Sequence, residues 1–208
     1  MTVTPQADVS VRSLASGASP PRPRSHIPGE VGVWILILGD MVVFAWFFIV
    51  FMHQRAQHRE AFNAAHKSLN LTFGGLNTML LLTGSWFVVM AIHALRADNR
   101  RIGKRFIAIA IGCGVGFVID KFLEYHDRII SGHPHDQADF FMYYFVLTGI
   151  HLVHLLIGLA VLALMLRVAG KPVLGPRQFR TLESGASFWH LVDLLWLVLF
   201  ALFYLVSG

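Results

Sequence analysis

The chain has 208 residues, of which 55% are hydrophobic and only 14% charged, and its mean hydropathy is +0.60. This composition excludes an ordinary soluble domain, because the apolar residues collect in runs of about 20 rather than alternating with polar ones. The formal net charge of +5 does not indicate a nucleic-acid partner, since the basic residues lie in short segments between apolar runs, where they indicate membrane topology. The single cysteine, Cys113, excludes an intrachain disulfide and a cysteine metal cluster.

The first 28 residues are rich in Pro, Ser and Arg and contain no long apolar stretch. Such a segment cannot bury enough apolar surface to offset its ordering entropy, so we expect a flexible tail over residues 1–28. Interruptions by Ser and Arg also argue against the apolar core of a signal peptide, so we expect the tail to be retained. The membrane domain is predicted to cover residues 29–208.

Five apolar segments follow the tail, and each is long enough to cross about 30 Å of hydrocarbon as an α-helix. Open sheets are excluded inside a bilayer because their edges leave backbone groups unsatisfied, and the short alternating runs of a β-barrel are missing. The sequence therefore predicts an all-α, polytopic membrane protein, a bundle of five transmembrane helices. The predicted spans are about 31–52, 72–95, 105–123, 140–168 and 186–207.

The distribution of Lys and Arg predicts the orientation of the bundle. The tail and the connections after the second and fourth spans together hold twelve basic residues, whereas the connections on the opposite side hold four. By the positive-inside rule, the N-terminus is predicted to be cytoplasmic and the C-terminus extracytoplasmic.

Ionisable residues inside membrane spans are costly and therefore informative. At a rise of 1.5 Å per residue they fall at different depths, so no single site can hold all of them. The residues in question are Asp40, His93, Asp120, Lys121, Glu124, His151, His154, His190 and Asp193.

The same arithmetic places Asp40 about 13 to 14 Å from the inner boundary, near the midplane. His154 and His151, on the fourth span, lie about 16 and 12 Å below the outer boundary. We therefore predict that Asp40 lies in the bundle interior, within hydrogen-bonding reach of His154 or, one turn away, of His151.

Two polar stripes follow from residues spaced three apart on one helix face, namely His151 with His154 and His190 with Asp193. Glu183 extends the second stripe. Three interpretations stay open: hydrogen bonds between helices that fix the packing, which we favour; a proton relay; and metal ligation. Metal ligation has the weakest support, because a di-iron bundle needs Glu-x-x-His on two helices at one level.

Gly112, Gly114 and Gly116 lie around Cys113, and Gly112 and Gly116 are small residues four apart. We expect these three glycines to serve close packing of helices.

Several motifs resemble subunit III of the haem-copper respiratory oxidases, in order and spacing from about Gly29 to the C-terminus. The last span carries Glu-x-Gly and then Trp-His-x-Val-Asp-x-x-Trp, and the fourth carries Gly-x-His-x-x-His. A carboxylate within the first shared helix also matches, here Asp40. The residues that carry the resemblance are Asp40, Asn77, Thr78, Glu124, Tyr125, Gly149, His151, His154, Glu183, Gly185, Trp189, His190, Asp193 and Trp196.

The resemblance implies a non-catalytic accessory subunit of a respiratory oxidase in the bacterial plasma membrane. Such a subunit binds no haem, copper or flavin; it packs against catalytic subunit I and other subunits, binds phospholipid, and supports assembly and proton uptake during aerobic electron transport. Haem and copper are expected in subunit I.

This sequence departs from the longer members of the family in three ways. It lacks two extra N-terminal helices, so it resembles the short five-helix bacterial type, which includes versions associated with quinol oxidases and nitric oxide reductases. Asp40 stands where the mitochondrial form has Glu, and Asp120 beside Lys121 is an unusual charged pair.

Two other functions compete with an accessory subunit. A stand-alone proton or ion transporter would use the same intramembrane Asp and His residues, but it predicts interrupted helices or an internal repeat, and the two halves of the sequence show neither. A membrane metal enzyme would require bound iron or copper.

Overall fold

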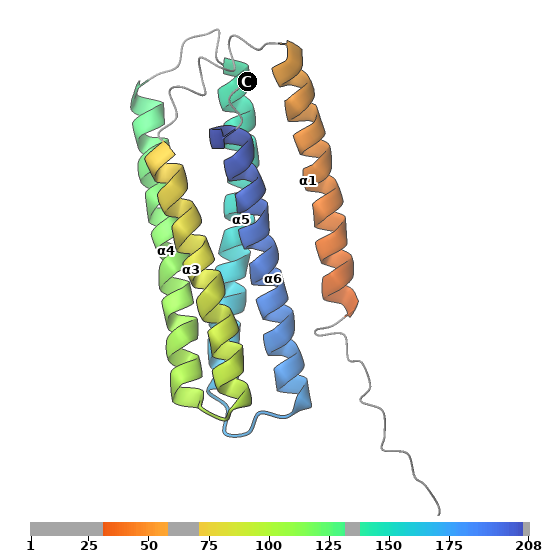
Figure 1. Cartoon of the computed structure of the whole chain (residues 1–208), viewed down its shortest axis with the longest axis vertical. Coiled ribbons are helices and arrows are strands. Elements are labelled where there is room, and N and C mark those ends of the chain that lie inside the picture. Colours follow the sequence, from red (N-terminus) through yellow and green to blue (C-terminus); the bar gives the residue numbers. More distant parts are fainter. Residues whose placement is uncertain (1–30, 58–70, 132–137, 206–208) are drawn as a thin grey trace, which may run out of the picture.

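The structure is a computed structural model that describes residues 31–57, 71–131 and 138–205, and within these ranges it contains helices and no strands (Figure 1). Five of the helices are long and apolar enough to cross a membrane, which confirms the predicted all-α fold. The flexible tail predicted for residues 1–28 lies outside the described residues. The helices are α1 (Val31–Gln57), α3 (Leu71–Arg96), α4 (Arg100–Ser131), α5 (Ala138–Ala169) and α6 (Pro176–Phe200), and a π-helical turn (Ala201–Leu205) continues α6.

The helices extend past the predicted spans, because a helix can continue beyond the hydrocarbon. The largest extension is at the start of α6, which begins ten residues before the predicted span. Pro176 occupies the first helical position, where its missing N–H costs nothing, and the Gly175 N–H donates to Gln178 Oε1 at 3.1 Å. The π-helical turn at the other end of α6 has i→i+5 hydrogen bonds, and it holds Tyr204 against the core.

Helices α3, α4, α5 and α6 form a closely packed bundle, in which α3 and α4 share the most extensive contact. Gly114 permits this packing, since a Cβ there would come within 2.7 Å of Leu159 Cδ2 and 2.9 Å of the Trp189 ring. Gly112 has nothing within 4 Å of a Cβ position. The packing role predicted for these glycines is therefore confirmed for Gly114 and wrong for Gly112, because the helix face at Gly114 meets α5 and α6.

Helix α1 stands beside this bundle and contacts it sparsely (Figure 1). Only 11% of its most apolar window is buried, compared with 56% for α6. Phe44 and Phe51 are its buried anchors: Phe44 lies against His154, and Phe51 lies against Phe140 and Phe203. Most of the remaining α1 side chains are exposed apolar residues, as expected for a helix that faces lipid or another subunit.

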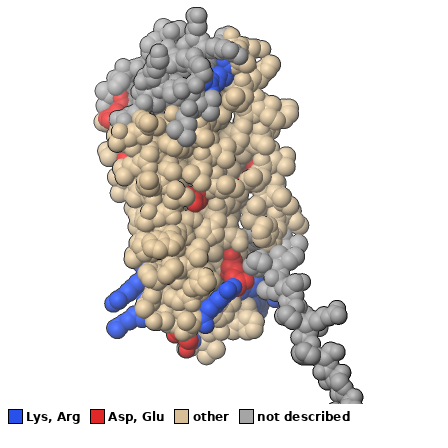
Figure 2. Space-filling view, in the orientation of Figure 1, with Lys and Arg blue, Asp and Glu red and all other residues tan. Residues whose placement is uncertain are grey.

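Basic residues gather at the end of the bundle where α3 joins α4 and α5 joins α6, which we call the basic end (Figure 2). This placement agrees with the sequence count. The basic end comprises Arg96, Arg100, Arg101, Lys104, Arg105, Arg167, Lys171, Arg177 and Arg180.

Candidate functional site

The first polar group joins α1 to α5. His154 Nε2 lies 3.0 Å from Asp40 Oδ1, and His154 Nδ1 lies 2.9 Å from the carbonyl oxygen of Ile150. The predicted pairing of Asp40 with one of two histidines is thereby confirmed, and the partner is His154. The pair is less enclosed than predicted, with side chains 14% and 22% exposed, because α1 packs only loosely on the bundle.

The second polar group lies at the end opposite the basic end and is almost completely buried. Lys121 Nζ donates to Glu124 Oε2 at 2.7 Å and to the Tyr144 hydroxyl at 3.0 Å. The hydroxyls of Tyr144 and Tyr204 each donate to Glu124 Oε1 at 2.7 Å. These bonds compensate the charge of the carboxylate, whose side chain is 2% exposed. The buried ion pair is Lys121 with Glu124, rather than Asp120 with its neighbour Lys121.

Aromatic rings form one wall of this group and join it to the middle of the bundle. Lys121 Nζ lies 4.8 Å from the centre of the Trp196 ring, a favourable cation–π distance. The Trp196 indole N–H donates to Thr78 Oγ1 at 3.1 Å. His151 is fully buried against the rings of Phe117 and Trp196, and neither of its ring nitrogens has a hydrogen-bond partner among the described residues.

Asn77 and Asp120 lie close together in the interior, where α3 faces α4. Both residues are buried, and Asp120 Oδ2 has no hydrogen-bond partner within the described part of the chain. Buried polar atoms of this kind are commonly satisfied by internal water.

The third polar group joins α3 to α6 nearer the basic end. Ser85 Oγ lies 2.5 Å from His190 Nδ1. The Ser85 side chain also lies close to the Asp193 carboxyl group. At the basic end itself, Arg96 donates to Glu183 Oε1 at 2.7 Å. The shared face predicted for His190 and Asp193 is thus directed at α3.

The structure therefore separates the predicted residues into groups at different levels, as the depth arithmetic required. It brings together Asp40 with His154, Glu124 with Lys121, and His190 with Asp193, but it keeps His151 apart from Asp40. Trp189 fills the space between helices beside Gly114 and Gly158, and its indole nitrogen has no hydrogen-bond partner among the described side chains and backbone.

Sequence reasoning missed Ser85, Tyr144 and Tyr204. The spacing of Lys121 and Glu124 by three residues was a usable signal for their ion pair. Nothing comparable marks Ser85 or the tyrosines, because their partners lie on other helices and depend on how those helices are rotated.

The described residues contain no group of three or more His, Cys, Asp or Glu side chains placed to hold a metal ion.

The fold and these buried groups define a class: a multi-pass helical membrane protein with polar contacts fixed between its helices. The sequence model for cytochrome c oxidase subunit III matches residues 26–208. The chain therefore belongs to the cytochrome c oxidase subunit III family.

Curated relatives from bacteria and an archaeon agree with this assignment. Cytochrome bo(3) ubiquinol oxidase subunit 3 of Buchnera aphidicola subsp. Schizaphis graminum is 25% identical, covering 84% of this chain and 92% of that protein. Cytochrome c oxidase subunit 3 of Alkalihalophilus pseudofirmus is 26% identical, covering 85% of this chain and 86% of that protein. Heme-copper oxidase subunit I+III of Aeropyrum pernix is 25% identical over 89% of this chain, which spans only 23% of that longer protein.

Proposed function

We propose that this chain is the accessory subunit III of a respiratory haem-copper oxidase, and that it packs against a catalytic subunit I that holds the haem and copper. The observation that carries this proposal is the family match over residues 26–208. The Aeropyrum pernix relative adds support, because its name joins subunit III to subunit I in one protein. The mostly exposed apolar surface of α1 fits contact with lipid or a neighbouring subunit.

The test is purification of this chain through an affinity tag from membranes of its native host, in mild detergent. We expect a haem-containing partner to copurify and to give a haem absorption band. A haem-free chain that is monomeric and stable alone would contradict the proposal. Proton or ion flux in proteoliposomes containing only this chain would instead establish a stand-alone transporter.

We further propose that the basic end faces the cytoplasm and contacts phospholipid headgroups. The support is the gathering of Lys and Arg at that end of the described helices (Figure 2). Labelling of single cysteines at Lys104 and at His53, which belong to opposite ends of the bundle, tests the orientation in a Cys113→Ala background. Labelling from the cytoplasmic side should modify Lys104→Cys and spare His53→Cys, and the reverse pattern would overturn the orientation.

The Asp40 and His154 pair supports either packing or proton uptake by the complex. Asp40→Asn separates these roles, because the amide keeps the shape and the hydrogen bonding but cannot ionise. Slower proton uptake in an intact complex would establish a proton-linked role, whereas unchanged uptake and turnover would establish packing.

A further inference from the structure

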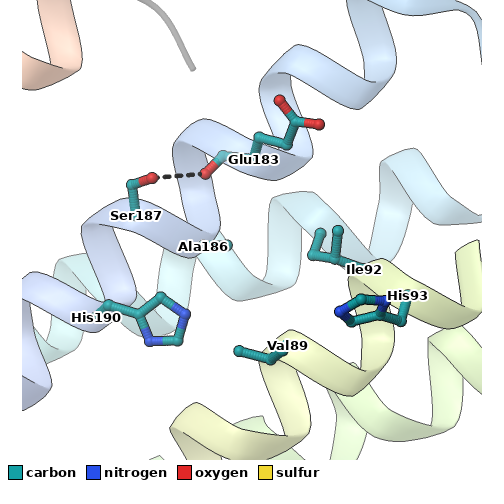
Figure 3. A pocket seen from close by; sticks show the side chains of 7 residues that line it. All are labelled: Val89, Ile92, His93, Glu183, Ala186, Ser187 and His190. Carbon is teal, nitrogen blue, oxygen red and sulfur yellow. Dashed lines mark hydrogen bonds between the residues drawn. The ribbon is translucent and has the colours of Figure 1, made fainter. Parts of the chain in front are cut away.

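A pocket of about 190 Å³ opens between α3 and α6 near the basic end. Figure 3 shows His93 and His190 directed from facing helices into this space, with Val89 beside them. His93 and Val89 are exposed, so the pocket opens to the outside of the bundle. Glu183 lines the pocket and is held by Arg96 at 2.7 Å, which places charged groups next to the opening.

A chain of hydrogen-bonding groups leads inward from this pocket. His190 lines the pocket, and its Nδ1 lies 2.5 Å from Ser85 Oγ. Ser85 also lies close to the carboxyl group of Asp193, three residues after His190 on α6. Asp193 is 7% exposed, and its Oδ1 has no hydrogen-bond partner among the described residues. Within the described ranges Asp120 also has an unpaired buried oxygen, so what distinguishes Asp193 is its place beside His190 and Ser85, which lead to the pocket.

The chain ends at Asp193. On α3, the residue one turn beyond Ser85 is Leu81, which is fully buried and apolar. On α6, the residue three positions beyond Asp193 is Trp196, whose indole N–H is already bonded to Thr78. Among the described residues, neither helix therefore extends the polar chain past Asp193, so the chain is a branch that opens at the pocket and not a channel across the bundle.

We propose that the pocket between α3 and α6 is the mouth of a short proton-exchange path that ends at Asp193. A hydronium ion in the pocket gives its proton to His190 Nε2, and the proton on His190 Nδ1 passes to Ser85 Oγ. The hydroxyl proton of Ser85 then passes to the Asp193 carboxylate, so that one proton moves inward and His190 changes tautomer. The reverse sequence returns the proton and restores the first tautomer.

This path deepens the proposed function, and its link to proton uptake by an oxidase rests on that function. Exchange at Asp193 is nevertheless a property of this chain and can be measured whichever partner binds. Because the basic end is proposed to face the cytoplasm, the path would hold a proton close to the side from which uptake occurs.

The experiment is infrared spectroscopy of the intact purified complex during transfer into D₂O, following the carbonyl stretch of protonated carboxyl groups. Asp120 is the matched control, because it is a buried aspartate 8% exposed that lies beside Asn77, eight residues or about 12 Å from Ser85 along α3. Asp193→Asn and Asp120→Asn assign the two bands by their loss. We expect the Asp193 band to exchange about ten times faster than the Asp120 band, equivalent to about 1.4 kcal/mol in barrier height.

His190→Asn keeps a hydrogen bond to Ser85 but cannot accept a proton at one atom while releasing one from another, and Ser85→Ala removes the hydroxyl. Both variants should slow Asp193 exchange to about the Asp120 rate, while Ser85→Thr should keep the native rate. If Ser85 had only a structural role, the Asp193 exchange rate would not differ in this way between Ser85→Ala and Ser85→Thr. Native exchange rates in His190→Asn and Ser85→Ala would overturn the proposal, as would the absence of a protonated Asp193 band.

If Ser85→Ala fails to assemble, a substitution that leaves His190, Ser85 and Asp193 unchanged can test the path instead. Val89→Trp fills the pocket from an exposed position and should slow Asp193 exchange, whereas Val115→Trp, at a similarly exposed position on α4, should not. Equal rates in these two variants would count against the path. Copurification of haem is scored separately, so failure of the proposed function is distinguishable from failure of the path.

Discussion

Helix α1 and the α3–α6 bundle are held in place in different ways. The bundle combines close contacts at glycine with buried aromatic rings and hydrogen-bonded polar groups. Helix α1 has the Asp40 and His154 pair and a few aromatic contacts, with most of its surface exposed. Since lipid tails are as apolar as leucine, burial of apolar surface gives no driving force between helices in a bilayer. Close packing and hydrogen bonds between helices must therefore determine how the bundle assembles. Helix α1 makes few contacts of either kind.

The largest expected effect comes from removing the charge that compensates a buried carboxylate in the bundle. Lys121→Met leaves Glu124 buried without its cation, and breaking such a pair costs about 3 to 5 kcal/mol. We expect a loss of that size in the free energy of unfolding, measured by denaturant titration in mixed micelles. Lys104→Met, at an exposed position on the same helix, should be nearly neutral. The double variant Lys121→Met with Glu124→Gln should recover part of the loss, and failure to do so would show that the ion pair is not the cause.

Overpacking at a close helix contact should give the next largest effect. Gly114→Val places atoms against Leu159 and the buried Trp189 ring, and overpacking of this kind costs about 1 to 3 kcal/mol. Gly112→Val, on the same helix, meets open space and should be tolerated. Thermal unfolding followed by circular dichroism compares the two variants directly. If Gly114→Val and Gly112→Val destabilised the protein equally, the cause would be the loss of glycine itself and not the contact between helices.

Breaking the polar pair of α1 should have a smaller effect on stability and a larger one on helix position. Asp40→Ala removes the pair, which is worth about 0.6 to 1.7 kcal/mol as a polar contact between membrane helices. Spin labels at Val42→Cys and Leu156→Cys, in a Cys113→Ala background, should show a broader α1–α5 distance distribution. Asp40→Asn, which can still bond to His154, should keep the narrow one. An unchanged distribution in Asp40→Ala would mean that the aromatic contacts alone place α1.

The smallest effect is expected at the basic end. Arg96→Gln removes the ion pair with Glu183, in which the Arg96 side chain is 55% exposed. Ion pairs exposed to water contribute about 0.2 to 1 kcal/mol and weaken with salt. The difference in unfolding free energy between native chain and variant should shrink as salt is added. If Arg96→Gln instead lowered the free energy of unfolding by several kcal/mol at every salt concentration, the pair would behave as a buried ion pair.

The sequence was sufficient to predict five helices and to narrow the partner of Asp40 to His154 or His151. Both depend only on position along the membrane normal, which follows from counting residues at 1.5 Å each. The bonds of Ser85 to His190 and of Tyr204 to Glu124 also depend on which helices are neighbours and how each is rotated. Hydropathy carries little information on rotation, because lipid-facing and core-facing residues are both apolar. The same limitation explains why packing was predicted for Gly112 as well as for Gly114, although a Cβ at Gly112 would meet no atom within 4 Å among the described residues.

The π-helical turn Ala201–Leu205 makes the end of α6 sensitive to the deletion of a single residue. In a regular helix, loss of one residue rotates everything that follows by about 100°. An in-frame deletion of one codon within residues 201–203 would therefore let α6 continue as a narrower helix and turn Tyr204 away from Glu124. The reading frame, the apolar character of the segment and its ability to cross a membrane would all survive. A length variant that looks harmless in a sequence comparison would thus cost the buried carboxylate one of its two hydroxyl donors.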